Sequence, residues 1–268
     1  MDNFNTLKRI EIFKDTMEWI VNDKDLRKAA SRSQTFIFWP DDYPYEQSII
    51  SEGDPATIKV TKERTFEAAM RLRNENPDAC IAVLNFANAF VPGGGVVEGC
   101  SAQEESLCRC STLYSQLVKK SEFYEYHNKH CTDKASDALM YSEDIVICKT
   151  DTDFPERLPK EEWCAVDVIT MAAPDLRGDY CSMSKAELYS CHVGRATHLF
   201  SIAQYIGVDI LVLGAFGCGA FENNPQIVAK AWSDVFIFFN RAFKEVDFAI
   251  YGSERNYLAF NSKFQPNL

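Results

Sequence analysis

The chain has 268 residues, of which 46% are hydrophobic and 25% are charged, so it can bury a sizeable core without disulfide or metal staples. It carries 28 lysine and arginine residues against 39 aspartate and glutamate residues, a net charge of −11. This acidic balance excludes a broad basic surface for duplex nucleic acid, because such binding depends mostly on neutralising phosphates. An anionic ligand would have to be bound by local groups such as backbone N–H groups and helix N-termini.

The N-terminus and the cysteines indicate where the protein resides. The N-terminal segment is amphipathic and carries Asp2, Glu11 and Asp15, unlike a signal or transit peptide. No uncharged apolar run approaches the ~18 residues that a membrane helix needs. Ten cysteines at irregular spacings indicate reduced thiols. We therefore expect a cytoplasmic protein that does not associate with membranes.

The hydrophobic pattern predicts alternating helices and strands from about residue 56 onward. Helices are expected over 5–22 and 64–74, from near residue 102, from Ser184, after Asn224 and at the C-terminus. Strands are expected over 35–39, 56–60, 80–85, 144–149, 164–172, 209–214 and 246–251. Glu187 completes a capping-box pattern with Ser184, and Asn224 followed by Pro225 is a helix-start signal.

The predicted order of elements indicates an α/β domain with three layers. Residues 80–85 and 209–214 are apolar without polar alternation, as expected of central strands that are covered on both faces. Residues 1–55 are predicted to form a helical N-terminal extension packed on a catalytic core of residues 56–268. Ligands of such sheets bind beyond the carboxyl ends of the strands.

The first glycine-rich segment occupies residues 85–105 and reads NFANAFVPGGGVVEGCSAQEE. Its triple glycine at 93–95 permits positive φ angles and close approach of the backbone to a ligand. A tight turn alone would explain the glycines, and Glu104 has the spacing of a capping partner for Ser101. The combination of an apolar strand, three glycines and the paired acids Glu104 and Glu105 favours a ligand site.

The second glycine-rich segment occupies residues 212–225 and reads VLGAFGCGAFENNP. Its glycines free successive N–H groups to form an anion nest. The segment lacks the Gly-Lys-Ser/Thr of a P-loop and the pattern of a dinucleotide-binding fingerprint. A tight strand-to-helix turn is the simpler alternative. The interleaved Phe216 and Phe221 are unusual in a plain turn and are expected to be exposed for stacking on a base or ribose.

Together, the two segments resemble a known family. The spacing GGG-x7-QEE at residues 93–105 resembles the signature of poly(ADP-ribose) glycohydrolases, and GAFGCGAF resembles their diphosphate-binding loop. The similarity is closest to the bacterial-type branch and extends from about residue 8 to residue 265. It includes RTFEAA at 64–69, SLCRCSTLY at 106–114 and NNPQIVA at 223–229. The resemblance implies a macrodomain-like α/β/α fold with a central mixed sheet.

The same resemblance implies an activity and the residues that carry it. The reaction would be hydrolysis of ribose–ribose O-glycosidic bonds in poly(ADP-ribose), with Glu105 as the general acid/base. Glu104 and Gln103 would hold the ribose being cleaved, Asn88 would contact the distal ribose, and Tyr251 would lie near the adenine. The other implied substrate-binding residues are Gly93, Gly94 and Gly95 in the first loop and Gly217, Cys218, Gly219, Ala220 and Phe221 in the second.

The residues fit this chemistry. Splitting the glycosidic bond requires an acid that protonates the leaving oxygen while an oxocarbenium ion forms, and the same carboxylate then activates water. Like-charge proximity of Glu104 and Glu105 raises a carboxyl pKa, which favours a protonated acid near neutrality. The expected substrate is poly(ADP-ribose) or an ADP-ribosylated protein, the product is ADP-ribose, and the chain is expected to be a monomer.

Other readings remain open. The chain is also compatible with a mono-ADP-ribosyl-protein hydrolase or with a non-catalytic ADP-ribose-binding macrodomain. A zinc site is disfavoured because the candidate ligands, Cys108, Cys110, His127, His130 and Cys131, lack zinc-ligand spacing. We expect no metal and no other cofactor, and we expect His192 and His198 to be surface or hydrogen-bonded histidines.

Overall fold

The computed structural model describes residues 2–43, 53–132, 134–178 and 183–265. Within these residues the helices are α1 (Asp2–Asn22), α2 (Lys24–Arg32), α3 (Thr65–Glu75), α4 (Gln103–Cys110), α5 (Tyr114–Leu117), α6 (Ser121–His130), η1 (Lys160–Glu162), α7 (Lys185–Ile206), α8 (Pro225–Phe236) and α9 (Glu254–Phe264). The strands are β1 (Thr35–Phe38), β2 (Thr57–Thr61), β3 (Ile81–Phe86), β4 (Leu139–Ile147), β5 (Cys164–Met171), β6 (Ile210–Leu213) and β7 (Glu245–Ala249).

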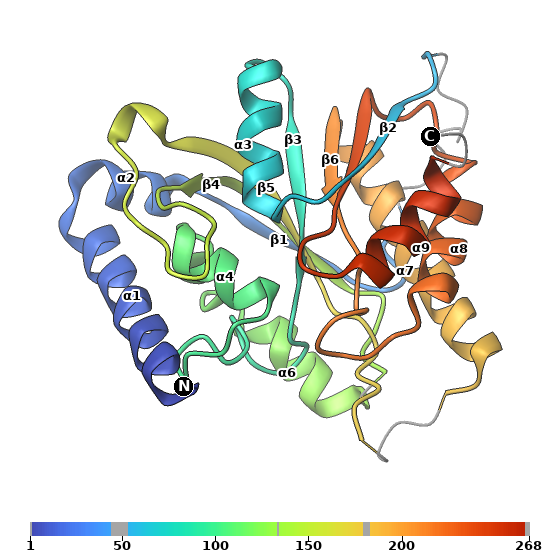
Figure 1. Cartoon of the computed structure of the whole chain (residues 1–268), viewed down its shortest axis with the longest axis horizontal. Coiled ribbons are helices and arrows are strands. Elements are labelled where there is room, and N and C mark those ends of the chain that lie inside the picture. Colours follow the sequence, from blue (N-terminus) through green and yellow to red (C-terminus); the bar gives the residue numbers. More distant parts are fainter. Residues whose placement is uncertain (1, 44–52, 133, 179–182, 266–268) are drawn as a thin grey trace.

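The described strands form a seven-stranded sheet in the order β1-β4-β5-β3-β6-β7-β2 (Figure 1). β3 lies at the centre and pairs in parallel with β5 and β6, and β7 and β2 extend the parallel part. β4 pairs antiparallel with both β5 and β1. The prediction of an α/β fold with a central mixed sheet is confirmed.

Helices cover both faces of this sheet, because successive side chains of a strand point to opposite sides. Ala82 and Leu84 of β3 pack in the core beneath α7, α8 and α9. Ile81 and Val83 pack in the core shared with α3, α4 and α6. Figure 1 shows the two groups of helices on either side of the sheet. The predicted three layers and the predicted central position of the strand at 80–85 are therefore confirmed.

The helices that begin with strong capping signals start where the sequence predicted. The Ser184 side chain accepts a hydrogen bond from the Glu187 N–H, and Glu187 reciprocates as a capping box. Asn224 caps α8 by accepting from the N–H groups of Gln226 and Ile227. The sequence reading missed α2, α5 and α6, and it placed the start of β4 at residue 144 instead of Leu139.

The N-terminal segment joins the core through a strand and through buried polar contacts. β1 is an edge strand of the sheet, paired with β4. The Nζ atom of the buried Lys149 donates to the Ile12 carbonyl at 3.1 Å and to Asp15 at 2.7 Å, which fixes α1. Residues 44–52 of the predicted extension lie outside the described residues, and the division after residue 55 stays a prediction.

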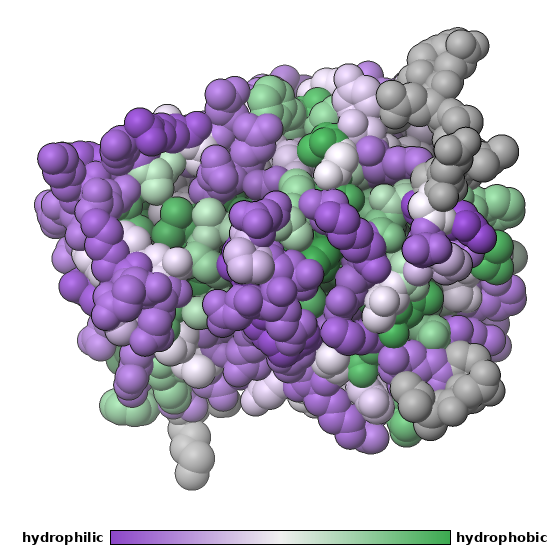
Figure 2. All heavy atoms as spheres, turned by 90° about the horizontal axis from the view of Figure 1, so that it is seen from above, coloured by the Kyte–Doolittle hydropathy of each residue, from purple (hydrophilic) through white to green (hydrophobic). Residues whose placement is uncertain are grey.

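The surface of the molecule is mostly hydrophilic. In the view from above in Figure 2, hydrophilic side chains dominate and apolar ones form separate patches. None of the helices in the described part of the chain is both long and apolar enough to cross a bilayer.

Candidate active site

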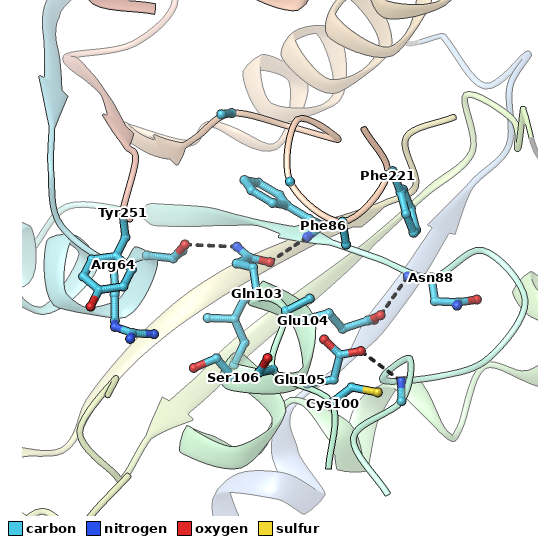
Figure 3. Close-up of a pocket in the computed structure, with 18 of the residues that line it drawn as sticks. Arg64, Phe86, Asn88, Cys100, Gln103, Glu104, Glu105, Ser106, Phe221 and Tyr251 are labelled. Atoms are coloured by element: carbon cyan, nitrogen blue, oxygen red, sulfur yellow. Dashed lines mark hydrogen bonds between the residues drawn. The ribbon is translucent and has the colours of Figure 1, made fainter. Parts of the chain in front are cut away.

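The two glycine-rich loops meet because β3 and β6 are neighbours in the parallel part of the sheet. Each loop leaves the carboxyl end of its strand, so both lie at the same edge of the sheet. Between them is a cavity of about 980 Å³ (Figure 3). The predicted site residues that line it are Asn88, Gly95, Gln103, Glu104, Glu105, Gly217, Gly219, Ala220, Phe221 and Tyr251. Gly93, Gly94 and Cys218 are not part of this lining.

Glu105 lies in the first turn of α4 and is almost buried, with 7% of its surface exposed. Its Oε1 atom accepts a hydrogen bond from the Gly95 N–H at 2.9 Å. Its Oε2 atom is buried and has no hydrogen-bond partner among the described residues. One oxygen of this cavity-lining carboxyl group is therefore fixed by the protein, and the other is buried without a partner in the described structure.

Glu104 is also buried, but the protein uses both of its oxygens. Oε1 accepts from the Asn85 side chain at 3.2 Å, and Oε2 accepts from the Asn88 N–H at 2.7 Å. Burial raises the pKa of Glu104 to about 8, with a smaller contribution from the charge of Glu105, although these hydrogen bonds act in the opposite direction. Like-charge proximity thus acts as predicted on Glu104, and burial is the larger cause.

The structure excludes the capping alternative for Glu104. The residue at the N-cap of α4 is Ala102, and its side chain makes no capping hydrogen bond. Glu104 bonds instead to the strand end and to the loop that follows β3. Its position is fixed by these two hydrogen bonds rather than by a cap at the helix start.

Gln103 connects α4 to the central strand. Its side-chain oxygen accepts from the Phe86 N–H at 2.8 Å, and its amide nitrogen donates to the Leu84 carbonyl at 2.7 Å and to Thr65 at 3.0 Å. These bonds fix the start of α4 beside the end of β3. Contact between Gln103 and a ribose stays a prediction.

Asn88 shapes the loop after β3. Its side-chain oxygen accepts from the N–H groups of Phe90 and Val91 at 2.8 and 3.0 Å, which closes a turn. Its side-chain NH2 group donates no hydrogen bond within the described residues and remains available to a ligand in the cavity.

The triple glycine has a different role at each position. Gly95 lines the cavity and supplies the N–H that bonds Glu105. A Cβ on Gly94, whose φ is +56°, would lie 2.6 Å from Glu105 Oε1. A Cβ on Gly93, whose φ is +71°, would lie 2.7 Å from the Tyr114 ring. Glycine is therefore required at positions 93 and 94, because the loop backbone packs directly against the side chains of Tyr114 and Glu105.

The second loop contributes backbone and one aromatic ring to the cavity. Gly217, Gly219, Ala220 and Phe221 line it. Cys218 is partly buried and packs against the core on the α7 side, and burial raises the pKa of its thiol.

The expectation of an exposed Phe216 is wrong. Its side chain is fully buried, with ring centroids 5.7 Å from both Phe86 and Trp232. The chain turns into the core immediately after β6, so alternation with glycine does not expose this ring.

Three arginines to which the sequence assigned no role line the cavity, namely Arg9 of α1, Arg64 and Arg177. The Arg64 guanidinium lies 4.0 Å from the centroid of the Tyr251 ring (Figure 3). The Arg177 guanidinium lies 5.2 Å from the centroid of the Phe221 ring and forms a 2.5 Å ion pair with Asp175. Arg64 and Arg177 are single residues in loops, where no periodic pattern indicates a role.

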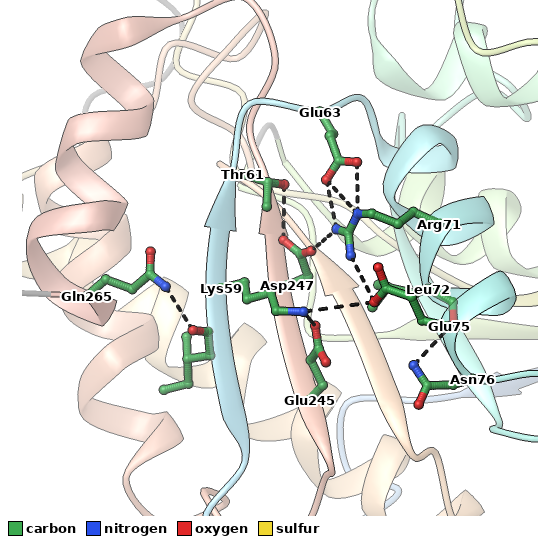
Figure 4. Close-up of polar contacts among 11 residues, drawn as sticks. Lys59, Thr61, Glu63, Arg71, Leu72, Glu75, Asn76, Glu245, Asp247 and Gln265 are labelled. Atoms are coloured by element: carbon green, nitrogen blue, oxygen red, sulfur yellow. Dashed lines mark hydrogen bonds and ion pairs between the residues drawn. The ribbon is translucent and has the colours of Figure 1, made fainter. Parts of the chain in front are cut away.

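A polar network supports the loop that carries Arg64. Arg71 of α3 bonds Glu63 at 2.7 Å and the fully buried Asp247 of β7 at 2.5 Å (Figure 4). Thr61, at the end of β2, donates to the same Asp247 at 3.1 Å. The network holds the β2–α3 loop in place at the edge of the cavity.

His192 and His198, expected to be surface or hydrogen-bonded histidines, are both buried and hydrogen-bonded. His192 is buried, and its Nε2 atom lies 2.8 Å from Asn223 Oδ1, while Trp232 donates to its Nδ1 atom. Burial lowers the pKa of His192 to about 4, so the ring is neutral near pH 7. His198 Nδ1 lies 2.5 Å from the Asp137 carbonyl. Across the described residues, no group of three or more His, Cys, Asp or Glu side chains is placed to hold a metal ion.

Comparison with known proteins identifies the family. Residues 7–150, more than half of the chain, match the catalytic domain of microbial-type PARG, that is, poly(ADP-ribose) glycohydrolase. A comparison with curated proteins found no match. Among solved structures, the poly(ADP-ribose) glycohydrolase of Thermomonospora curvata is 31% identical with a TM-score of 0.84, over 96% of this chain and 99% of that one.

Two further solved structures carry ligands. The Thermomonospora curvata enzyme bound to the inhibitor ADP-HPD is 31% identical with a TM-score of 0.83, over 96% of this chain and 99% of that one. The Deinococcus radiodurans poly(ADP-ribose) glycohydrolase in complex with ADP-ribose is 29% identical with a TM-score of 0.78, over 91% of this chain and 98% of that one. The chain therefore belongs to the microbial-type poly(ADP-ribose) glycohydrolase family, whose catalytic domain hydrolyses poly(ADP-ribose).

Proposed function

We propose that Glu105 is the general acid and base of poly(ADP-ribose) hydrolysis and that the cavity binds the terminal ADP-ribose unit. The observation that carries this proposal is the Oε2 atom of Glu105, which is buried without a partner in the described structure and belongs to a side chain that lines the cavity. An unpartnered buried polar atom costs free energy unless a ligand satisfies it.

The reaction needs one proton donor and one water molecule. The protonated Glu105 carboxyl group donates its proton to the glycosidic oxygen while the bond from that oxygen to the anomeric carbon breaks. The resulting Glu105 carboxylate takes a proton from water as the water oxygen bonds to the anomeric carbon. The acid is thereby regenerated, and ADP-ribose with a free anomeric hydroxyl is released.

The binding groups proposed for ADP-ribose are mainly backbone N–H groups and aromatic rings. Gly217, Gly219 and Ala220 would hold the diphosphate, since a glycine-rich turn presents its N–H groups to an anion. Phe221 would stack on the ribose, and Tyr251 would lie near the adenine. Asn88, with its free side-chain NH2 group, would contact the distal ribose.

Two ligand-bound relatives support this assignment of the ligand. The Deinococcus radiodurans enzyme was solved with ADP-ribose and the Thermomonospora curvata enzyme with ADP-HPD. A cavity of about 980 Å³ is at the large end of the range for sites that hold a drug-sized ligand.

Replacing Glu105 by glutamine tests the proposal. Glutamine is nearly isosteric but does not exchange a carboxylic proton, so Glu105→Gln should lower kcat by roughly 10²–10⁴-fold. ADP-ribose affinity should hold or rise slightly, because one negative charge beside the diphosphate is removed. The measurements are ADP-ribose release from polymer and calorimetric binding of ADP-ribose.

The control is Glu125→Gln, which makes the same substitution at an exposed acid of α6 that pairs with Lys129. It should leave turnover and affinity at the parent values. Parent-like turnover of Glu105→Gln would refute the acid/base role. Assaying the parent on mono-ADP-ribosylated protein as well as on polymer decides whether the substrate range extends beyond the polymer.

A further inference from the structure

Arg109 is a buried cation that the proposed chemistry does not use. It lies on α4, one helical turn after Glu105, and only 2% of its surface is exposed. No ion pair joins it to an acid in the described part of the chain, and its Nε atom is buried without a hydrogen-bond partner there. Burying a guanidinium without an anionic partner is costly. The hydrogen bonds of Arg109 must therefore contribute to stability or to function enough to offset this free-energy cost.

The hydrogen bonds of Arg109 lead back to Glu105. Its Nη1 atom donates to the Cys100 carbonyl at 2.6 Å. The Cys100 N–H donates to the Gly95 carbonyl at 3.0 Å, and the Gly95 N–H donates to Glu105 Oε1 at 2.9 Å. Because Glu105 and Arg109 are one turn apart on α4, these bonds and the helix form a closed ring.

The ring borders the cavity through Gly95, Cys100 and Glu105. Cys100 and Glu105 both line the cavity and lie side by side in Figure 3, but Arg109 is not among the lining residues of the described chain. A second contact steadies the same loop, since Arg9 of α1 donates from Nε to the Gly99 carbonyl at 2.7 Å. The catalytic side of the loop is thus held from α4 and from α1.

We propose that Arg109 is a positioning residue for Glu105, an inference that rests on the proposed function. Arg109 holds residues 95–100 against α4 through the Cys100 carbonyl. The Gly95 N–H then occupies Oε1 of Glu105 and leaves Oε2 directed to the glycosidic oxygen. Without the guanidinium, the Cys100 carbonyl loses a buried donor, the loop relaxes, and the Glu105 carboxyl group loses its fixed orientation.

The test compares three variants of the full chain. Arg109→Met removes the charge and the donor, and Arg109→Lys keeps the charge and one donor. Arg73→Met is the matched control, because the Arg73 guanidinium of α3 also donates to backbone carbonyls, at 2.6 Å to Ala79 and 2.9 Å to Ala165, and also has a buried Nε without a partner in the described structure, but it lies outside the ring and the cavity lining. The readouts are kcat and KM on polymer, calorimetric ADP-ribose affinity, and the melting temperature.

Arg109→Met should lower kcat by roughly 10–100-fold. This is the range expected when a catalytic group is slightly displaced from the position in which it reacts. The variant's KM and ADP-ribose affinity should stay near the parent values. Arg109→Lys should recover much of the lost kcat. Arg73→Met should lose thermal stability without losing kcat.

Parent-like kcat in Arg109→Met would overturn the proposal. Equal losses of kcat and affinity in Arg109→Met, or a loss of kcat in Arg73→Met as large as in Arg109→Met, would also overturn it by indicating general damage. If Arg109→Met fails to fold, amide hydrogen exchange in Arg109→Lys decides. Faster exchange over residues 95–100 together with a lower kcat supports positioning, whereas a parent-like kcat despite faster exchange refutes it.

Glu105→Gln separates this proposal from the one on which it rests. If Glu105→Gln is inactive and Arg109→Met is fully active, only the positioning role fails. If Glu105→Gln turns over at the parent rate, the acid/base assignment fails whatever Arg109 does.

Discussion

Glu104 and Glu105 are adjacent in the first turn of α4, but the protein occupies their carboxyl oxygens differently. Both oxygens of Glu104 accept hydrogen bonds from the segment around the end of β3. Among the described residues, Glu105 is hydrogen-bonded at Oε1 only. The two residues therefore suit different roles: Glu104 holds the backbone and side chains around the end of β3 in place, and Glu105 exchanges the proton.

The raised pKa of Glu104 has a consequence for stability. A carboxyl group with a pKa near 8 in the folded state, against an ordinary value of 4.5, binds a proton on folding between these pH values. This contribution to the free energy of unfolding is fully present below pH 4.5 and is lost as the pH rises through 8.

Glu104→Gln should remove that pH dependence. Between about pH 5 and about pH 9, the parent should lose stability relative to the variant by a few kcal/mol, at about 1.4 kcal/mol for each unit of pKa shift. Urea unfolding of both proteins across this range measures the difference. A constant difference in free energy of unfolding would mean that Glu104 titrates alike in the folded and unfolded chains.

Phe221 tests the aromatic wall of the cavity. Phe221→Ala should weaken ADP-ribose binding by roughly 1–3 kcal/mol if the ring stacks on the ligand, as for other aromatic stacking contacts with nucleic acid bases. Phe238→Ala is the control, since that ring is 64% exposed on a different part of the molecule. Calorimetry that gives unchanged affinity for Phe221→Ala would remove Phe221 from the binding site.

Site residues that belong to a spaced sequence pattern could be predicted, whereas isolated residues could not. The glycines and the paired acids could be found because their spacing is a pattern. Arg64 and Arg177 reach the cavity from loops, and their place depends on contacts with Tyr251 and Phe221 that form only in the folded chain. The burial of Phe216 likewise depends on the path of the chain after β6.

At the scale of elements, α4 and β3 form one unit. Gln103 bonds two backbone groups of β3, so the helix that carries the acids is fixed to the central strand. Elements with a strong local signal, such as capped α7 and α8, could be predicted. α6 buries only a narrow set of side chains, namely Phe123, Tyr124 and His127, and so has a weak pattern.

The link between α3 and β7 can be measured by a double-mutant cycle. Arg71→Met leaves Asp247 buried beside Thr61 without its cation, and breaking a buried pair costs about 3–5 kcal/mol. Because Arg71 is partly exposed, we expect the lower end of that range. Asp247→Asn in the same background should recover part of the loss, with a coupling of about 1 kcal/mol or more. Additive effects in urea unfolding would show that the two side chains do not interact.

At the scale of the whole molecule, the sheet order brings distant segments to one edge. The loops after β3 and β6 are far apart in sequence, and the parallel pairing of their strands makes them neighbours. That meeting could be predicted from the apolar strands and the position of the glycines. The placement of β1 beside β4 depends on long-range pairing, which local sequence does not specify.

A crystal structure of Glu105→Gln with ADP-ribose tests the central claim most directly, because it locates the distal ribose relative to residue 105. We predict that the anomeric hydroxyl lies within hydrogen-bond distance of the residue 105 side chain, with the diphosphate against residues 217–221 and the Gly95 N–H still bonded to that side chain. A distal ribose bound out of reach of residue 105, or ADP-ribose bound outside the cavity between the two glycine-rich loops, would contradict the account.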